Sequence, residues 1–184
     1  RNVNYVHQFR SNEDSARFLA SEWLRNNPHR IHLGLIGLYI INREGEEIEI
    51  GEIKQPVQEL DLWSGRISST FKVDDIPVTV ETLCHPDLDI VSARISSPLI
   101  SDKRLMIRME FPLGIPGPAG YDLNSPDGHA TEILSESGEE TLIGRSQDND
   151  CYFARVLHPG SRVEASGRHR YLLVPEGDSI LEFS

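Results

Sequence analysis

The sequence predicts a mainly β protein, an antiparallel sandwich or barrel with one short helix near its N-terminus. Many short apolar runs are separated by Gly- and Pro-containing turns at roughly ten-residue spacing, a pattern typical of all-β folds. Residues 105–111 alternate apolar and polar side chains, as a half-buried strand does. Helical periodicity is convincing in one segment alone, which limits the expected helix content.

That helix is expected over residues 14–26. Its apolar residues recur at helical spacing and form one stripe: Ala16, Leu19, Ala20, Trp23 and Leu24. Ser11 or Asn12 can cap the N-terminus, and Pro28 ends the helix. We expect Trp23 to be a packing residue rather than a platform for a ligand.

Strands are expected throughout the chain after Pro28. They are predicted at residues 31–42, 57–63, 67–73, 76–83, 89–96, 105–111, 131–134, 141–145, 151–157, 170–174 and 180–183. The first is long and rich in Ile and Leu, which favours a buried strand with bulges at its glycines. Asp74-Asp75 predicts a two-residue hairpin turn.

A different composition marks residues 112–128. Prolines and glycines punctuate this segment at eight positions: Pro112, Gly114, Pro116, Gly117, Pro118, Gly120, Pro126 and Gly128. It is predicted to be a long loop, and long loops in compact domains are often functional. The spacing of Gly114, Gly117 and Gly120 superficially suggests a phosphate-binding loop. The interleaved prolines lack the backbone N–H groups that such a loop requires, which argues against it.

Charge and cysteine content narrow the classes of partner. The net charge of −11 argues against nucleic acid and against an anionic membrane surface, whereas neutral sugars remain compatible. No apolar run is long enough to span a bilayer. Cys84 and Cys151 are expected to be buried thiols rather than a disulfide, and neither has the CxxC partner of a zinc site.

Motifs that carry catalytic chemistry are missing from the sequence. It contains no GxSxG, GxGxxG or GxxxxGK motif, and its seven histidines show no HxxxH pair. Adjacent acidic pairs in turns point to opposite faces. Asp148-Asn149-Asp150 lacks the glycine and downstream Glu of a calcium loop and is expected to be a turn. We therefore predict no catalytic residue, no metal site and no cofactor in this chain.

Four strings are more specific than composition. They are NPHRIHLGLIG at 27–37, QELDLWSGRI at 58–67 with STF at 69–71, HPD at 85–87 followed by SSPL at 96–99, and NSPDGHAT at 124–131. Taken in this order they resemble the N-terminal β-supersandwich region of bacterial six-hairpin glycosidases. The second string is also similar to a strand pair in the maltose and trehalose phosphorylase family.

The resemblance implies an antiparallel β-supersandwich followed by an (α/α) toroid that carries the catalytic acids. The chain starts at Arg1 without Met and ends in mid-strand at Ser184, so we expect an excerpt with the toroid after residue 184. Residues 1–28 would form an N-terminal extension with the helix, and residues 29–184 the sandwich. Expected partners are the toroid, a carbohydrate substrate and a second copy in a homodimer, in a periplasmic or exported protein.

In such a family the sandwich can lend a loop to the rim of the active site. The corresponding loop here is 112–128, which makes Tyr121, Asp122 and His129 candidates for substrate contact. Trp63 is a fourth candidate, although core packing is the favoured expectation for it.

Two alternatives to a non-catalytic domain of a carbohydrate-active enzyme remain open. A stand-alone carbohydrate-binding module should expose a row of aromatic rings, yet aromatic residues make up only 7% of the chain and form no such row. A protein-interaction module should expose an apolar patch, but a docking face for a toroid would look the same.

Overall fold

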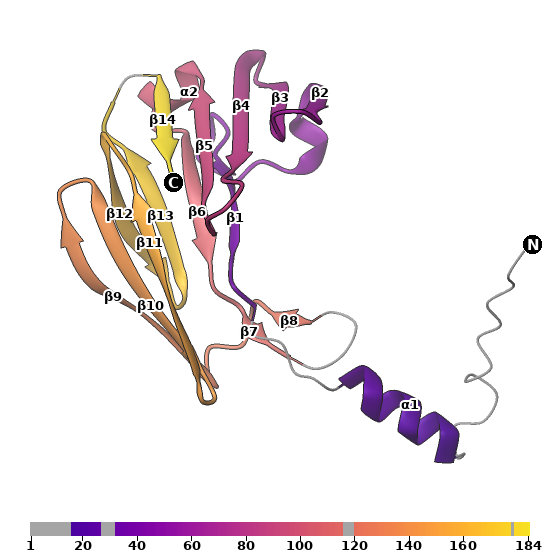
Figure 1. The fold of residues 1–184 in the computed structure, drawn as a ribbon. Coiled ribbons are helices and arrows are strands. Elements are labelled where there is room, and N and C mark those ends of the chain that lie inside the picture. The colour runs from indigo at the N-terminus through magenta and orange to yellow at the C-terminus, as the bar shows by residue number, and fades with distance from the viewer. Residues whose placement is uncertain (1–15, 27–31, 116–119, 178) are drawn as a thin grey trace, which may run out of the picture.

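The computed structural model describes residues 16–26, 32–115, 120–177 and 179–184 (Figure 1). The protein is mainly β, with 59% strand and 9% helix, and its sheets are antiparallel, which confirms the predicted fold class. The helical elements are α1 (Ala16–Asn26), α2 (Pro98–Ser101) and a single 3₁₀ turn, Ile50–Glu52. The strands are β1 (Leu35–Ile40), β2 (Lys54–Asp61), β3 (Arg66–Val73), β4 (Ile76–Cys84), β5 (Val91–Ser96), β6 (Leu105–Glu110), β7 (Leu113–Gly114), β8 (Tyr121–Asp122), β9 (His129–Ser137), β10 (Glu140–Gln147), β11 (Asp150–Leu157), β12 (Ser161–Gly167), β13 (Arg170–Pro175) and β14 (Ile180–Phe183).

The strands form two packed layers. One layer is the sheet β1-β6-β13-β12. The other combines β11-β10-β9 with β14-β5-β4-β3-β2, because Leu157 and Ser184 exchange backbone hydrogen bonds of 2.8 and 3.0 Å between β11 and the end of β14. The pair β7–β8 forms a separate ribbon near one end of the sandwich (Figure 1).

Strand β6 shows why the layers pack. Leu105, Ile107 and Met109 point inward and are buried, while the residues between them are only partly covered. Ile107 pairs with Leu173 of β13, which is also fully buried. The core joins residues from all three large sheets: Ile40, Val73, Val78, Ile95, Leu99, Ile100, Leu105, Ile107, Met109, Phe111, Ile143, Val156, Val163, Tyr171, Leu173, Leu181 and Phe183.

Two predicted turns are present. Asp74 and Asp75 have φ of 52° and 63°, the left-handed conformation that a two-residue turn between twisted strands requires. Asp148 has φ of 54° and opens the β10–β11 turn, so the Asp148-Asn149 segment is a turn as expected.

Five short elements were not predicted from the sequence: the 3₁₀ turn, α2, β7, β8 and β12. Helix α2 has only four residues, but Ser97 caps it by accepting from the Leu99 N–H at 3.2 Å, and Pro98 occupies its first position. Its Leu99 and Ile100 are buried. Strand β12 carries few apolar residues because only one of its faces meets the core, through Val163.

The predicted helix is present as α1, and the predicted residues 14 and 15 lie outside the described part. The expectation that Trp23 packs is wrong, because its side chain is 65% exposed. Leu19 and Leu24 of the same stripe are 62% and 65% exposed. The apolar face of α1 is therefore not covered by any of the described residues.

The strand predicted at residues 31–42 is present as β1, but its expected burial and the expected packing of Trp63 are wrong. Strand β1 is an edge strand, of which Ile40 alone is buried, and residue 31 lies outside the described part. Strand β2 is the outermost strand of its sheet, exposed at every residue, and Trp63 in the following turn is 100% exposed. Apolar content predicted burial there, whereas position at a sheet edge leaves both strands open to solvent.

The two thiols are free, but the expected burial is wrong. Cys84 and Cys151 are both exposed, at the end of β4 and near the start of β11. Strand composition around each cysteine predicted burial, whereas both residues lie near strand ends.

Within the described residues, none of the helices has the length and apolar character needed to cross a membrane.

We predict that Ile107→Ala lowers the free energy of unfolding by about 2–5 kcal/mol, because the truncation leaves a cavity in the core. Ile107 is 2% exposed, whereas Ile50 is 89% exposed, so Ile50→Ala is a matched control expected within about 0.5 kcal/mol of the wild type. Urea denaturation checks both values, and equal losses would contradict the assignment of the core.

Candidate functional site, the anchors of the 112–128 loop

The inward face of strand β10 ends in two large polar side chains, Arg145 and Gln147. Thr141, Ile143, Arg145 and Gln147 alternate inward, and all four are at least 96% buried. Buried Arg and Gln are costly unless hydrogen bonds satisfy them. Their partners come from the loop predicted at residues 112–128, whose first arm covers this end of β10.

Gln147 binds the backbone of Gly114 on both sides. The Gly114 N–H donates to Oε1 at 2.8 Å, and Nε2 donates to the Gly114 carbonyl at 2.8 Å. Gly114 also belongs to β7, which pairs with Tyr121 and Asp122 of β8. The buried amide therefore fixes one arm of the loop at the root of its ribbon.

Arg145 anchors the same arm and reaches the other one. Its Nη2 donates to the Pro112 carbonyl, and its Nη1 contacts Nδ1 of His129. Arg145 is 2% exposed, and among the described residues no carboxylate forms an ion pair with it. Its Nε is buried without a hydrogen-bond partner, and burial lowers the pKa of this guanidinium.

Two histidines hold the second arm. His129 donates from Nε2 to the Ser125 carbonyl at 3.1 Å, and His169 donates from Nε2 to the Pro126 carbonyl at 3.1 Å. The two imidazole rings stack with centroids 3.8 Å apart. Arg168 adds an exposed ion pair to Asp127 at 3.2 Å. The loop is thus held at both of its ends by side chains of the sandwich.

These contacts determine the protonation state of His129. Arginine is a donor only, so Nδ1 of His129 must accept, and the proton lies on Nε2, which faces a carbonyl. Burial lowers the pKa of His129, and the Arg145, His169 and Arg168 side chains lower it further, whereas the Ser125 bond opposes them. His129 is therefore neutral at neutral pH.

Further rings surround the loop. Tyr121 of β8 meets His32 edge to face, with centroids 4.9 Å apart. The Tyr152 hydroxyl donates to the Leu33 carbonyl. Burial raises the pKa of Tyr152, an effect that the charge of Arg145 opposes, and burial followed by Arg145 lowers the pKa of His32.

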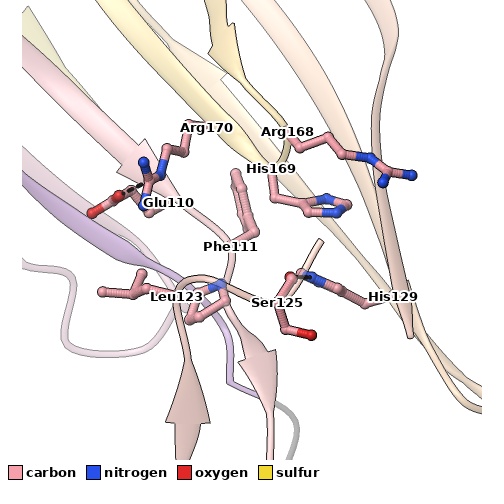
Figure 2. A pocket seen from close by; sticks show the side chains of 9 residues that line it. Glu110, Phe111, Leu123, Ser125, His129, Arg168, His169 and Arg170 are labelled. Atoms are coloured by element: carbon pink, nitrogen blue, oxygen red, sulfur yellow. Dashed lines mark hydrogen bonds and ion pairs between the residues drawn. The ribbon is translucent and has the colours of Figure 1, made fainter. Parts of the chain in front are cut away.

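A small hollow lies between the loop and the sandwich. Figure 2 shows His129 and His169 on one side of it and the Glu110–Arg170 ion pair on the other, with Phe111 between them. Its empty volume is about 180 Å³, part of it open solvent, below the roughly 300–1,000 Å³ of ordinary ligand pockets. It suits water better than a sugar.

A larger groove, with an empty volume of about 820 Å³ that includes open solvent, lies on the outer face where β11 meets β14. The ion pairs Arg66–Glu81 at 3.1 Å and Arg94–Glu182 at 3.3 Å line it, together with Leu83 and Leu157. None of the sequence-predicted site residues contributes to this groove.

Three of the four predicted site residues belong to the loop and its anchors. Tyr121 is 37% exposed, Asp122 accepts from the Asn124 N–H at 2.8 Å, and His129 opens β9. Trp63 is separate from them, on the β2–β3 turn.

Sequence reasoning missed Arg145, Gln147 and His169. The signal for Arg145 and Gln147 was the two-residue alternation of β10. Every second residue of this strand points inward up to Gln147, although the last two inward residues are polar.

Within the parts of the chain that the structure describes, no three His, Cys, Asp or Glu residues are grouped to hold a metal ion. Both ring nitrogens of His129 and of His169 are engaged by protein atoms. The histidine pair is therefore built to hold backbone rather than to present free ligand atoms.

A scan against models of known protein families finds no family that matches this chain, and a search of curated proteins finds no matching relative.

We predict that Gln147→Leu lowers the free energy of unfolding by about 2 kcal/mol or more, because the Gly114 N–H and carbonyl lose the buried amide that pairs them. Amide exchange should also quicken at residues 113–115 and 120–122. Gln58→Leu is the matched control, since that Gln is exposed and its side chain, within the described part of the chain, bonds Ser69 alone, at 2.9 Å. Equal stability of the two variants by denaturation would contradict the anchoring role.

Proposed function

We propose that this chain is a non-catalytic β-sandwich domain of a carbohydrate-active enzyme of the six-hairpin glycosidase type. In this proposal it packs on a helical toroid of the same polypeptide and holds loop 112–128 at the rim of the active site. The four sequence strings support the family, and with it the expectation of a periplasmic or exported protein. The anchored loop supports the role of the domain.

The observation that carries the proposal is the double anchoring of the loop. Arg145 and Gln147 use buried polar atoms to hold Pro112 and Gly114, while His129 and His169 hold the returning arm. Buried polar networks of this kind order a segment more than an apolar contact would, because each bond has a direction. A segment ordered at its base can present side chains to a substrate in a defined position.

Tyr121 and Asp122 are suited to sugar contact. The ring of Tyr121 meets His32 edge to face, and because the residue is 37% exposed, part of it is accessible for stacking on a sugar face. The Asp122 carboxylate, half-buried, accepts one backbone N–H through Oδ1 and can accept a sugar hydroxyl through its second oxygen.

The edge of the five-stranded sheet supports a docking role. Residues 50–63 include five large apolar residues that are exposed: Ile50 89%, Val57 56%, Leu60 55%, Leu62 84% and Trp63 100%. An exposed apolar edge strand invites association, and natural proteins usually cover one. We assign this segment, including Trp63, to contact with the toroid rather than with the sugar.

We predict that Tyr121→Ala in the full polypeptide raises KM for an oligosaccharide substrate roughly 3- to 10-fold, the loss of one aromatic contact, while kcat changes less. Tyr121→Phe, which keeps the ring, should stay near the wild type. Steady-state kinetics check both variants.

The isolated 184-residue chain should turn over no aryl glycoside and give no heat of binding with oligosaccharides. Turnover by the pure chain would overturn the proposal. Oligosaccharide binding by the chain alone would favour a stand-alone sugar-binding module instead.

We predict that the double substitution Leu62→Ser, Trp63→Ser leaves the Tm of the isolated chain unchanged, since both residues are exposed. In the full polypeptide it should uncouple the domains, so that calorimetry shows two thermal transitions where the wild type shows one. Leu88→Ser is the control, at a residue 57% exposed outside this segment. A single transition in all three proteins would contradict the docking assignment.

A further inference from the structure

We propose that His129 makes the anchoring of the loop acid-sensitive: its protonation releases the second arm, residues 124–128, while the sandwich and the first arm stay in place. The inference concerns the anchoring alone and does not depend on a role in sugar chemistry. It rests on the contacts of one ring and on the charges that surround it.

The geometry leaves no place for a second proton on His129. Nδ1 accepts from Arg145, and Nε2 already carries the proton that it donates to the Ser125 carbonyl. Protonation at Nδ1 would set one donor against another and place two positive charges in contact. Because Arg145 is 2% exposed, it cannot move to solvent, whereas the ring of His129 is only half-buried. His129 is therefore the group that leaves.

The charged and titratable groups around His129 favour the same outcome. Arg145 of β10 contacts the ring, and His169 before β13 stacks on it, with Arg168 adding a second positive side chain nearby. The acids of this region are already paired: Asp127 with Arg168, and Glu110 with Arg108 and Arg170. Within the described residues no carboxylate forms an ion pair with His129 to stabilise its cation.

The direction with pH follows from this arrangement. The pKa of His129 is lower in the folded protein than in the unfolded chain, mainly because of burial and then because of Arg145. The stabilisation is complete above the unfolded pKa, about 6.5, and is lost as the pH falls through the folded pKa.

The two arms should respond differently. Ser125 loses its donor when the ring of His129 swings out, and the stacked His169, which holds Pro126, loses its neighbour. Gln147, which holds Gly114, has no titratable group and keeps its two bonds. Acid should therefore open one arm and leave the other closed.

NMR relaxation and backbone amide exchange test this on the folded 184-residue chain, from about pH 7.5 to about pH 5. The ¹H–¹⁵N heteronuclear NOE of Asn124, Ser125, Asp127 and Gly128, which reports backbone order, should fall as the pH drops from about 6.5 through the folded pKa of His129 and should level off below it. Amides of residues 113–114, and of Ile107 in the core, should keep their protection.

His129→Asn keeps an acceptor for Arg145 but cannot titrate, so its second arm should show no acid-dependent opening. His85→Gln is the control, since His85 is exposed and bonds only its own turn, and it should open as the wild type does.

Three outcomes would overturn the proposal: a wild-type arm whose heteronuclear NOE stays unchanged, an Asn variant that opens equally, or loss of amide protection at Ile107 together with the arm, which would mean global unfolding.

Discussion

The site depends on one constraint: the backbone of the loop enters the protein interior, where its polar groups need partners. Pro112 and Gly114 are buried, and within the described residues no strand of the opposite layer forms a backbone ladder with them. Strand β10 meets this requirement by replacing apolar residues with Arg145 and Gln147 at two successive inward positions. The polar end of β10 is therefore explained by the loop that covers it.

The choice of an arginine without an acid partner has consequences for the whole cluster. A buried guanidinium is tolerated because a carbonyl and a neutral imidazole accept its protons, not because a carboxylate neutralises it. The neutral state of His129 is thus a condition of the packing. The stacked His169 depends on the same state, since two adjacent cations would repel. Loop position and protonation are coupled in one network.

Particular elements show how far sequence reasoning reached. Alternation in β6 and the Asp74-Asp75 turn were predicted, because local residue chemistry decides both. Burial of Trp63 and Cys84 was mispredicted, because composition does not reveal which strand lies at an edge or where a strand ends. His129 was found through a motif resemblance. Arg145 was missed because an Arg in an apolar strand suggests that the strand ends there. Only the structure shows that the Pro112 carbonyl accepts from this buried side chain.

The exposed apolar segment at residues 50–63 and the anchored loop at residues 112–128 have a common explanation. The apolar segment at residues 50–63 is exposed, while the buried side chains of Arg145 and Gln147 hold the base of a loop whose residues 120–128 are only partly covered. A domain that served only its own stability would do the opposite, covering apolar side chains and leaving the loop to solvent. Each feature is accounted for if a second surface lies against the edge strand and the loop faces that neighbour. In that case the sequence of the domain meets two requirements, the stability of its own fold and contact with the neighbouring surface.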